Sequence, residues 1–99
     1  MSSAYIIADV DVKNPAQYEE YKRLSSIAMK AHGAQVCVRG GKVDVLEGDW
    51  QPTRITVLRF PSFEAAQAFY DAESYRAARA LRLGTTDRFN MILTEGLPI

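Results

Sequence analysis

The glycine-bounded segment from Arg39 to Trp50 constrains the fold of this chain more than any other feature. Gly40-Gly41 stands before a short alternating stretch, Val43–Leu46, and Gly48–Pro52 follows it. A glycine pair in this position marks either a bend in a strand or a tight turn. We favour the bend, so that Val43–Leu46 continues the preceding strand and Gly48–Pro52 is the true loop. The segment therefore predicts a β-hairpin in the middle of the chain.

A strand and a helix are predicted before this hairpin. Tyr5–Val12 is rich in β-branched and aromatic residues, which favours a strand. Asn14 can cap a helix that starts at Pro15, and Gln17 occupies the capping-box position. Apolar residues then recur every three or four positions, which predicts a helix from about Pro15 to His32. Ala34–Arg39 is the first strand of the hairpin.

The second half of the chain repeats the alternation of strand and helix. Arg54–Phe60 is predicted as the third strand, and Ser62 can cap the helix that follows. Asp71–Glu73 interrupts this helix before Ser74 caps one or two further turns. Phe89–Thr94 is the fourth strand. The residues of the later helical turns that we expect to face the core are Tyr75, Ala78 and Leu81.

The order β-α-β-β-α-β is that of a ferredoxin-like α+β fold. It predicts one domain over residues 1–99, with both helices on one face of a four-stranded antiparallel sheet. Apolar residues occupy both faces of the strands, as Ile55 and Val57 alternate with Leu58 and Phe60. A face in water would be polar instead. We therefore expect a second copy of the chain to cover the second face, which makes a homodimer.

Composition restricts the partners and the compartment. Lys plus Arg and Asp plus Glu number 12 each, so net charge gives no attraction to nucleic acid or to an anionic membrane. No apolar run is long enough to span a membrane. Cys37 is the single cysteine, which suits a core residue in a reducing compartment, and we predict a cytoplasmic protein. One His and one Cys leave no ligand set for a metal or haem, and we predict no cofactor.

A family resemblance covers nearly the whole chain. Its most specific parts are the run from Arg39 to Trp50 and the step Phe60-Pro61-Ser62. The other matching residues are Tyr5, Tyr18, Tyr21, Gly33, Arg54, Ala65-Ala66, Ser74-Tyr75, Arg82 and Glu95-Gly96. On these residues the chain resembles the domain-of-unknown-function 1330 family, in the dimeric α+β barrel superfamily. Tyr70 stands where the family often has Trp.

The resemblance implies a homodimer whose paired sheets form a barrel-like core, with small clefts between each sheet and its helices. It implies no particular reaction. Relatives in the superfamily include cofactor-independent monooxygenases, lactone isomerases and haem-dependent enzymes, and activity does not follow from fold.

Arg39 and Arg54 are the first candidates for a ligand site. They lie on the two strands of the hairpin, where they can project together into a cleft and bind a carboxylate or an enolate. An inter-strand or dimer-interface ion pair with Glu47 is the alternative, and we favour it because structural ion-pair networks often resemble binding sites. The further ligand-binding candidates are Tyr5, Tyr18, Tyr21 and Asn90.

The candidates for the dimer interface are Trp50, Glu47 and Phe60. Trp50 is a large apolar side chain in a predicted loop, and such a residue commonly anchors a partner. His32, the only histidine, can act as a general base near neutral pH. Its predicted place at a helix C-terminus favours a capping role instead.

Three functions remain open at the level of sequence. The first is a homodimer that binds a small organic molecule between sheet and helices, with cofactor-independent isomerase or monooxygenase-like chemistry as an open question. The second is a non-catalytic structural or protein-interaction module. The third is a nucleic-acid accessory protein that uses Arg76, Arg79 and Arg82, although a solvated helix face, with Arg82 turned inward to an acidic partner, suits the neutral charge better.

Overall fold

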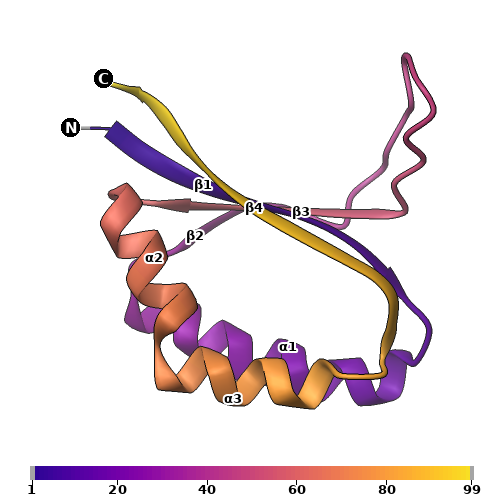
Figure 1. The fold of residues 1–99 in the computed structure, drawn as a ribbon, viewed down its shortest axis with the longest axis horizontal. Coiled ribbons are helices and arrows are strands. Elements are labelled where there is room, and N and C mark those ends of the chain that lie inside the picture. The colour runs from indigo at the N-terminus through magenta and orange to yellow at the C-terminus, as the bar shows by residue number, and fades with distance from the viewer. Residues whose placement is uncertain (1, 99) are drawn as a thin grey trace.

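The computed structural model describes residues 2–98 and shows the predicted order of elements, with helices and a sheet in two layers (Figure 1). Its elements are β1 (Ser2–Val12), α1 (Pro15–Ala31), β2 (Gln35–Arg39), β3 (Arg54–Phe60), α2 (Phe63–Asp71), α3 (Glu73–Arg82) and β4 (Thr86–Pro98). The strands form one antiparallel sheet in the order β2-β3-β1-β4. The predicted ferredoxin-like α+β fold is therefore confirmed.

All three described helices lie against the same face of the sheet (Figure 1). The residues of β1 that point to them are Ala4, Ile6, Ala8 and Val10, and all four are buried. β3 pairs in register with β1, so that Phe60 lies opposite Ala4 and Arg54 opposite Val10. Because side chains alternate along a strand, the even-numbered residues of β1 and β3 share the helix-facing side.

The predicted helix starts are confirmed by their capping contacts. The Asn14 side chain accepts a hydrogen bond from the Gln17 backbone N–H at 3.2 Å, and the Ser62 hydroxyl accepts one from Ala65 at 3.0 Å. Pro15 takes the first helical position of α1. His32 follows α1 as its C-cap, where its Nδ1 lies 2.9 Å from the Ala28 carbonyl oxygen. The capping role of His32 agrees with this geometry.

The segment after β2 differs from the prediction. Val43–Leu46 does not continue the strand, and residues 40–53 instead form an irregular arm that rises from the sheet on the side away from the helices (Figure 1). Gly40 leaves the sheet with a φ of +62° after its N–H donates to the Ile55 carbonyl. The alternation at Val43–Leu46 resembled a strand, but no strand within residues 2–98 pairs with it.

Three smaller predictions were wrong. Ser74 does not cap α3, because the helix begins at Glu73, two residues earlier than a Ser74 cap would require, with Ala72 as its N-cap and no side-chain cap bond. Leu81 is exposed, so that only Tyr75 and Ala78 of the expected residues are buried. Cys37 is exposed as well, because β2 is an edge strand. β4 also extends beyond the predicted Phe89–Thr94 at both ends.

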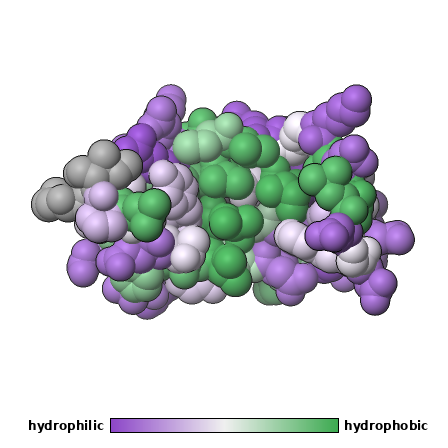
Figure 2. Space-filling view, turned by 90° about the horizontal axis from the view of Figure 1, so that it is seen from above, coloured by the Kyte–Doolittle hydropathy of each residue, from purple (hydrophilic) through white to green (hydrophobic). Residues whose placement is uncertain are grey.

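The face of the sheet opposite the helices, here called the open face, is apolar across its middle. Val38, Val57, Ile7 and Ile92 follow one another from β2 to β4 in paired positions. Figure 2 views this face and shows the apolar band, with polar residues toward both ends of the strands. Ile92 is 60% exposed and Val38 40% exposed. An apolar row across a whole sheet is unusual for a surface that stays in water.

Among residues 2–98, no helix is long and apolar enough to cross a membrane.

Candidate functional site

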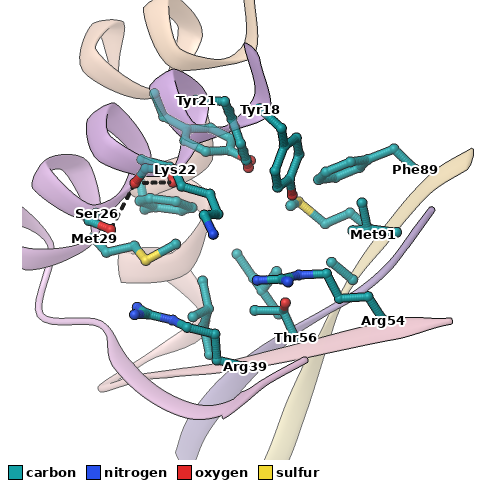
Figure 3. A pocket seen from close by; sticks show the side chains of 17 residues that line it. Tyr18, Tyr21, Lys22, Ser26, Met29, Arg39, Arg54, Thr56, Phe89 and Met91 are labelled. Atoms are coloured by element: carbon teal, nitrogen blue, oxygen red, sulfur yellow. Dashed lines mark hydrogen bonds between the residues drawn. The ribbon is translucent and has the colours of Figure 1, made fainter. Parts of the chain in front are cut away.

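A cavity of about 100 Å³ lies between the sheet and the helices (Figure 3). The strands supply one wall, with Ile6, Ala8, Val10, Arg39, Arg54, Thr56, Leu58, Phe89 and Met91. The helices supply the other, with Tyr18, Tyr21, Lys22, Ser25, Ser26, Met29, Phe69 and Tyr75. The cavity is therefore placed where the resemblance implied a cleft.

The sequence of α1 makes room for this cavity. Its six lining residues recur every three or four positions from Tyr18 to Met29, so they share one helix face. Ser25 and Ser26 are small, and both hydroxyls donate to the Lys22 carbonyl, at 3.2 and 2.8 Å. Ala8 is equally small on the wall opposite. Larger side chains at these three positions would fill the space.

The charged side chains around the cavity are all cations. Lys22, Arg39 and Arg54 line it, and none of the lining residues is Asp or Glu. Lys22 pairs with Glu19 at 2.8 Å on the exposed side of α1. Within residues 2–98, neither arginine pairs with Glu47, which lies exposed on the arm. The inter-strand form of the ion pair is therefore wrong, and an ion pair of Glu47 across a dimer interface stays a prediction.

Arg54 is held in place by its surroundings. Its guanidinium lies against Gly40, where an added Cβ would come within 3.1 Å of Nη1. Its Nε is buried and has no hydrogen-bond partner among the described residues. A buried donor without a partner costs free energy, commonly about 1–3 kcal/mol. A side chain that lines the cavity therefore carries an unsatisfied donor.

Two buried phenols and an arginine join α1 to α3 beside the cavity. The hydroxyls of Tyr21 and Tyr75 are 2.7 Å apart, and Arg82 Nη1 donates to Tyr75 at 3.0 Å and to Tyr21 at 3.3 Å. Burial raises the pKa of both tyrosines, although the Arg82 charge opposes this. Both phenols are therefore protonated at neutral pH, and one of the two hydroxyls donates to the other while both accept from Arg82.

Tyr18 is the phenol that faces the open space of the cavity. It is 6% exposed, its hydroxyl points into the cavity (Figure 3), and it makes no hydrogen bond with any of residues 2–98. Burial raises the pKa of Tyr18 as well, opposed by the charge of Arg54. This hydroxyl is a second free donor in the cavity.

The structure separates the predicted site residues into two groups. Tyr18, Tyr21, Arg39 and Arg54 all line the cavity. Tyr5 and Asn90 lie on the open face, because they belong to the opposite set of alternating positions on β1 and β4. They do not contact the cavity.

The candidates for the dimer interface are separated in the same way. Phe60 is 1% exposed and packs against Phe69 in the core, with ring centroids 5.2 Å apart, so it offers no surface to a partner. Trp50 and Glu47 both lie on the arm and are exposed. The arm also exposes Leu46, at 87%.

An ion pair on the open face anchors the arm. Asp9 accepts hydrogen bonds from Arg88, at 3.1 Å to each carboxylate oxygen, and from Trp50 Nε1 at 2.9 Å. Burial alone would raise the pKa of Asp9, but the hydrogen bonds from Trp50 and Arg88 and the charge of Arg88 together lower it. Thr53 adds a hydrogen bond from its hydroxyl to the Val10 carbonyl at 2.9 Å.

The arginines of α3 do not form a free basic strip. Arg82 turns inward as expected, but its partners are the two phenols and the Phe89 ring, 3.6 Å away, and not an acidic residue. Arg79 stacks on Tyr70 with its guanidinium 4.0 Å from the ring centroid. Only Arg76 of the three is fully exposed.

Sequence reasoning missed several residues of the site. Lys22, Ser25, Ser26 and Met29 share the helix face of Tyr18, and that spacing was a usable signal. The contact of Arg88 with Asp9 spans 79 positions, and no local pattern marks it. Among residues 2–98, no three His, Cys, Asp or Glu side chains gather as a metal site would require.

Comparisons with known proteins agree with the fold. The sequence matches the domain of unknown function DUF1330 over residues 3–97. No curated protein matches the chain by sequence.

Three solved structures are similar. A Rhodopseudomonas palustris protein of unknown function is 19% identical with a TM-score of 0.76, over 99% of this chain and 85% of that one. A dimeric ferredoxin-like protein of unknown function from Thermobifida fusca is 16% identical, with a TM-score of 0.64 over 97% and 92%. A candidate antibiotic biosynthesis monooxygenase from Nitrosomonas europaea is 16% identical, with a TM-score of 0.59 over 96% and 90%. At these identities the likeness establishes the shared fold alone.

Proposed function

Since this chain belongs to the DUF1330 family, whose function is unknown, we propose that it is a homodimer that binds a small organic molecule in the cavity between sheet and helices. The observation that carries the proposal is the cavity itself, with the Arg54 Nε buried in its wall and unpartnered among the described residues. Buried polar groups are almost always satisfied in native proteins, by protein, water or ligand. A bound molecule with an acceptor atom would satisfy this one.

The apolar row on the open face supports the homodimer. A second copy laid face to face would remove Val38, Val57, Ile7 and Ile92 from water, which is favourable in proportion to the apolar area buried. The arm, which carries the exposed Leu46 and Trp50, rises on the same side of the sheet (Figure 1) and extends the surface available to the partner. Similar structures described as dimeric ferredoxin-like proteins agree with this assembly.

The proposal is limited to binding. Cofactor-independent isomerase or monooxygenase chemistry that begins with an enolate needs a base to form it. The lining residues include no carboxylate and no histidine, and the one amine, Lys22, pairs with Glu19. What the lining does offer is cations and protonated phenols, which stabilise negative charge on a bound oxygen.

A screen of small organic molecules followed by amide NMR shifts tests the binding role. Binders are expected to shift α1 and β3 resonances around the cavity, and Arg54→Ala is expected to abolish those shifts while the protein stays dimeric, because Arg54 faces the helices. Arg76→Ala removes an exposed arginine from α3 and serves as the matched control. Loss of the dimer in Arg54→Ala with no change in binding would favour the non-catalytic structural module instead.

A further inference from the structure

Resting on the proposed function, we infer that the ligand is a short-chain oxo acid, whose carboxylate binds Arg54 and Arg39 and whose carbonyl oxygen accepts a hydrogen bond from Tyr18. The inference adds a chemical class to the binding role. It depends on three properties of the cavity: its charge, its free donors and its size.

The charge of the cavity selects an anion. The lining carries Lys22, Arg39 and Arg54 and no acidic residue, and only Lys22 has an acidic partner in residues 2–98. Arg39 is exposed at the end of β2, whereas Arg54 reaches further into the cavity (Figure 3). A guanidinium presents a planar fork that matches a carboxylate, so a carboxylate is the anion that these side chains suit best.

The conformation of Gly40 shows that the position of Arg54 is built into the chain. A Cβ at residue 40 would make a tight contact with the Arg54 guanidinium, at 3.1 Å from Nη1 and 3.2 Å from Cζ. The neighbouring Gly41 has nothing within 4 Å of an added Cβ. Gly40 is therefore the glycine that leaves room for Arg54, and the buried Nε of the same side chain has no partner among the described residues.

Tyr18 defines a second point of contact. Its hydroxyl and the Arg54 guanidinium are directed into the same space from opposite walls, one from α1 and the other from β3 (Figure 3). Since the phenol is protonated at neutral pH, it donates, and its partner must be an acceptor such as a carbonyl oxygen. Met91 and Phe89, which also line the cavity, supply apolar contacts for the carbon chain of the ligand.

The volume of the cavity limits the length of the ligand's carbon chain. It measures about 100 Å³. An enclosed apolar cavity of about 150 Å³ holds one benzene molecule. A ligand with a carboxylate near the exposed Arg39 and a short oxo chain inside fits this space, whereas a fused ring system does not.

Three probes separate the parts of the inference. Acetoacetate has both the carboxylate and the carbonyl, butyrate lacks the carbonyl, and acetoacetamide lacks the charge. Dissociation constants from NMR titration of the whole protein are expected to rank acetoacetate tightest, by about tenfold over acetoacetamide, as a charge-assisted hydrogen bond implies. Butyrate is expected to bind severalfold more weakly than acetoacetate.

Two variants assign the preferences to their residues. Arg54→Gln is expected to remove the preference for acetoacetate over acetoacetamide, and Tyr18→Phe the preference for acetoacetate over butyrate. Arg76→Ala should leave both ratios unchanged. Amide spectra that match the wild-type protein away from the cavity show that each variant is folded.

Several results would overturn the inference. Acetoacetamide that binds in the cavity as tightly as acetoacetate would contradict the carboxylate while leaving the proposed binding role intact. Inorganic phosphate that displaces acetoacetate with equal affinity would show a general anion site. If none of the three probes shifts the cavity resonances, the oxo-acid class is wrong, and the broader screen alone then decides the proposed function.

Discussion

Gly40 has no side chain, and this leaves room for the Arg54 guanidinium beside it. Gly40 has a φ of +62°, a region that residues with a Cβ rarely adopt, and an added Cβ would lie only 3.1 Å from the Arg54 guanidinium. Gly41 has neither constraint. Two adjacent glycines thus have different reasons to be present.

Gly40→Ala is therefore expected to lower the free energy of unfolding by about 1–3 kcal/mol, from backbone strain and from displacement of Arg54. Gly41→Ala is the matched control and should change stability by less than about 0.5 kcal/mol. Urea unfolding of both variants measures this difference. Equal effects would show that Arg54 does not depend on Gly40.

Asp9 is a second residue whose role follows from its contacts. It is 6% exposed and holds both Arg88 and the arm residue Trp50. Because its folded-state pKa is lowered below the ordinary value of 3.8, it stabilises the folded protein fully above that value. The stabilisation is lost as the pH falls through the lower folded-state pKa.

Asp9→Asn is expected to lower the free energy of unfolding by about 1–3 kcal/mol at neutral pH, and the difference should shrink below about pH 4. Trp50 is the only tryptophan, so its fluorescence reports on this contact during urea unfolding. Asp11→Asn, on the same strand and face, is the control. A loss in Asp9→Asn that stays constant down to the acid limit would contradict the role of the ionised carboxylate.

At the scale of elements, α1 and α3 are joined by the hydroxyl pair of Tyr21 and Tyr75. Both phenols are buried and both accept from Arg82, so three polar groups satisfy one another inside an apolar layer. This arrangement fixes the helix-side wall of the cavity. Tyr70, one helix earlier, is 40% exposed and makes no such bond within the described residues.

Tyr75→Phe is expected to cost about 1 kcal/mol of unfolding free energy, because it leaves Tyr21 and Arg82 without one partner. Tyr70→Phe removes the same atom from an exposed ring and should be neutral within about 0.5 kcal/mol. Thermal unfolding of the two variants measures the difference. Identical midpoints would show that the hydroxyl pair adds nothing to the packing of α1 against α3.

The elements were predictable where local chemistry determines them. β3 has the predicted bounds, Arg54–Phe60, and Asn14 and Ser62 cap their helices as expected. The predicted Ser74 cap was wrong because α3 starts at Glu73, with Ala72 as an N-cap that makes no side-chain hydrogen bond. The strand predicted at residues 43–46 was wrong because alternating apolar and polar residues form a strand only when another strand is available to pair with them.

The candidate site was predictable only in part. The helix spacing of Tyr18 and Tyr21 and the strand position of Arg54 indicated residues that do line one cavity. Tyr5 and Asn90 are polar residues on strands in the same way, but they lie on the opposite side of the sheet. The side on which a strand residue lies depends on the register of that strand. The phenol pair Tyr21–Tyr75 spans 54 positions and depends on how α1 and α3 pack together.

At the scale of the whole molecule, the sheet has two different faces. One face packs on the helices and borders the cavity, and the other presents the apolar row from Val38 to Ile92 (Figure 2). In the proposed homodimer the second face is covered by a partner. Ile92 is then buried against the other copy, although it is 60% exposed in the single chain.

The most direct test of this assembly is sedimentation equilibrium at micromolar protein on the wild type, Ile92→Asp and Leu83→Asp. The wild type should sediment as a dimer and Ile92→Asp as a folded monomer, because a charge in a desolvated apolar interface is costly. Leu83 lies in the turn after α3, is 75% exposed and is remote from the open face, so Leu83→Asp should remain dimeric. A wild-type protein that sediments as a stable monomer would contradict the proposed homodimer.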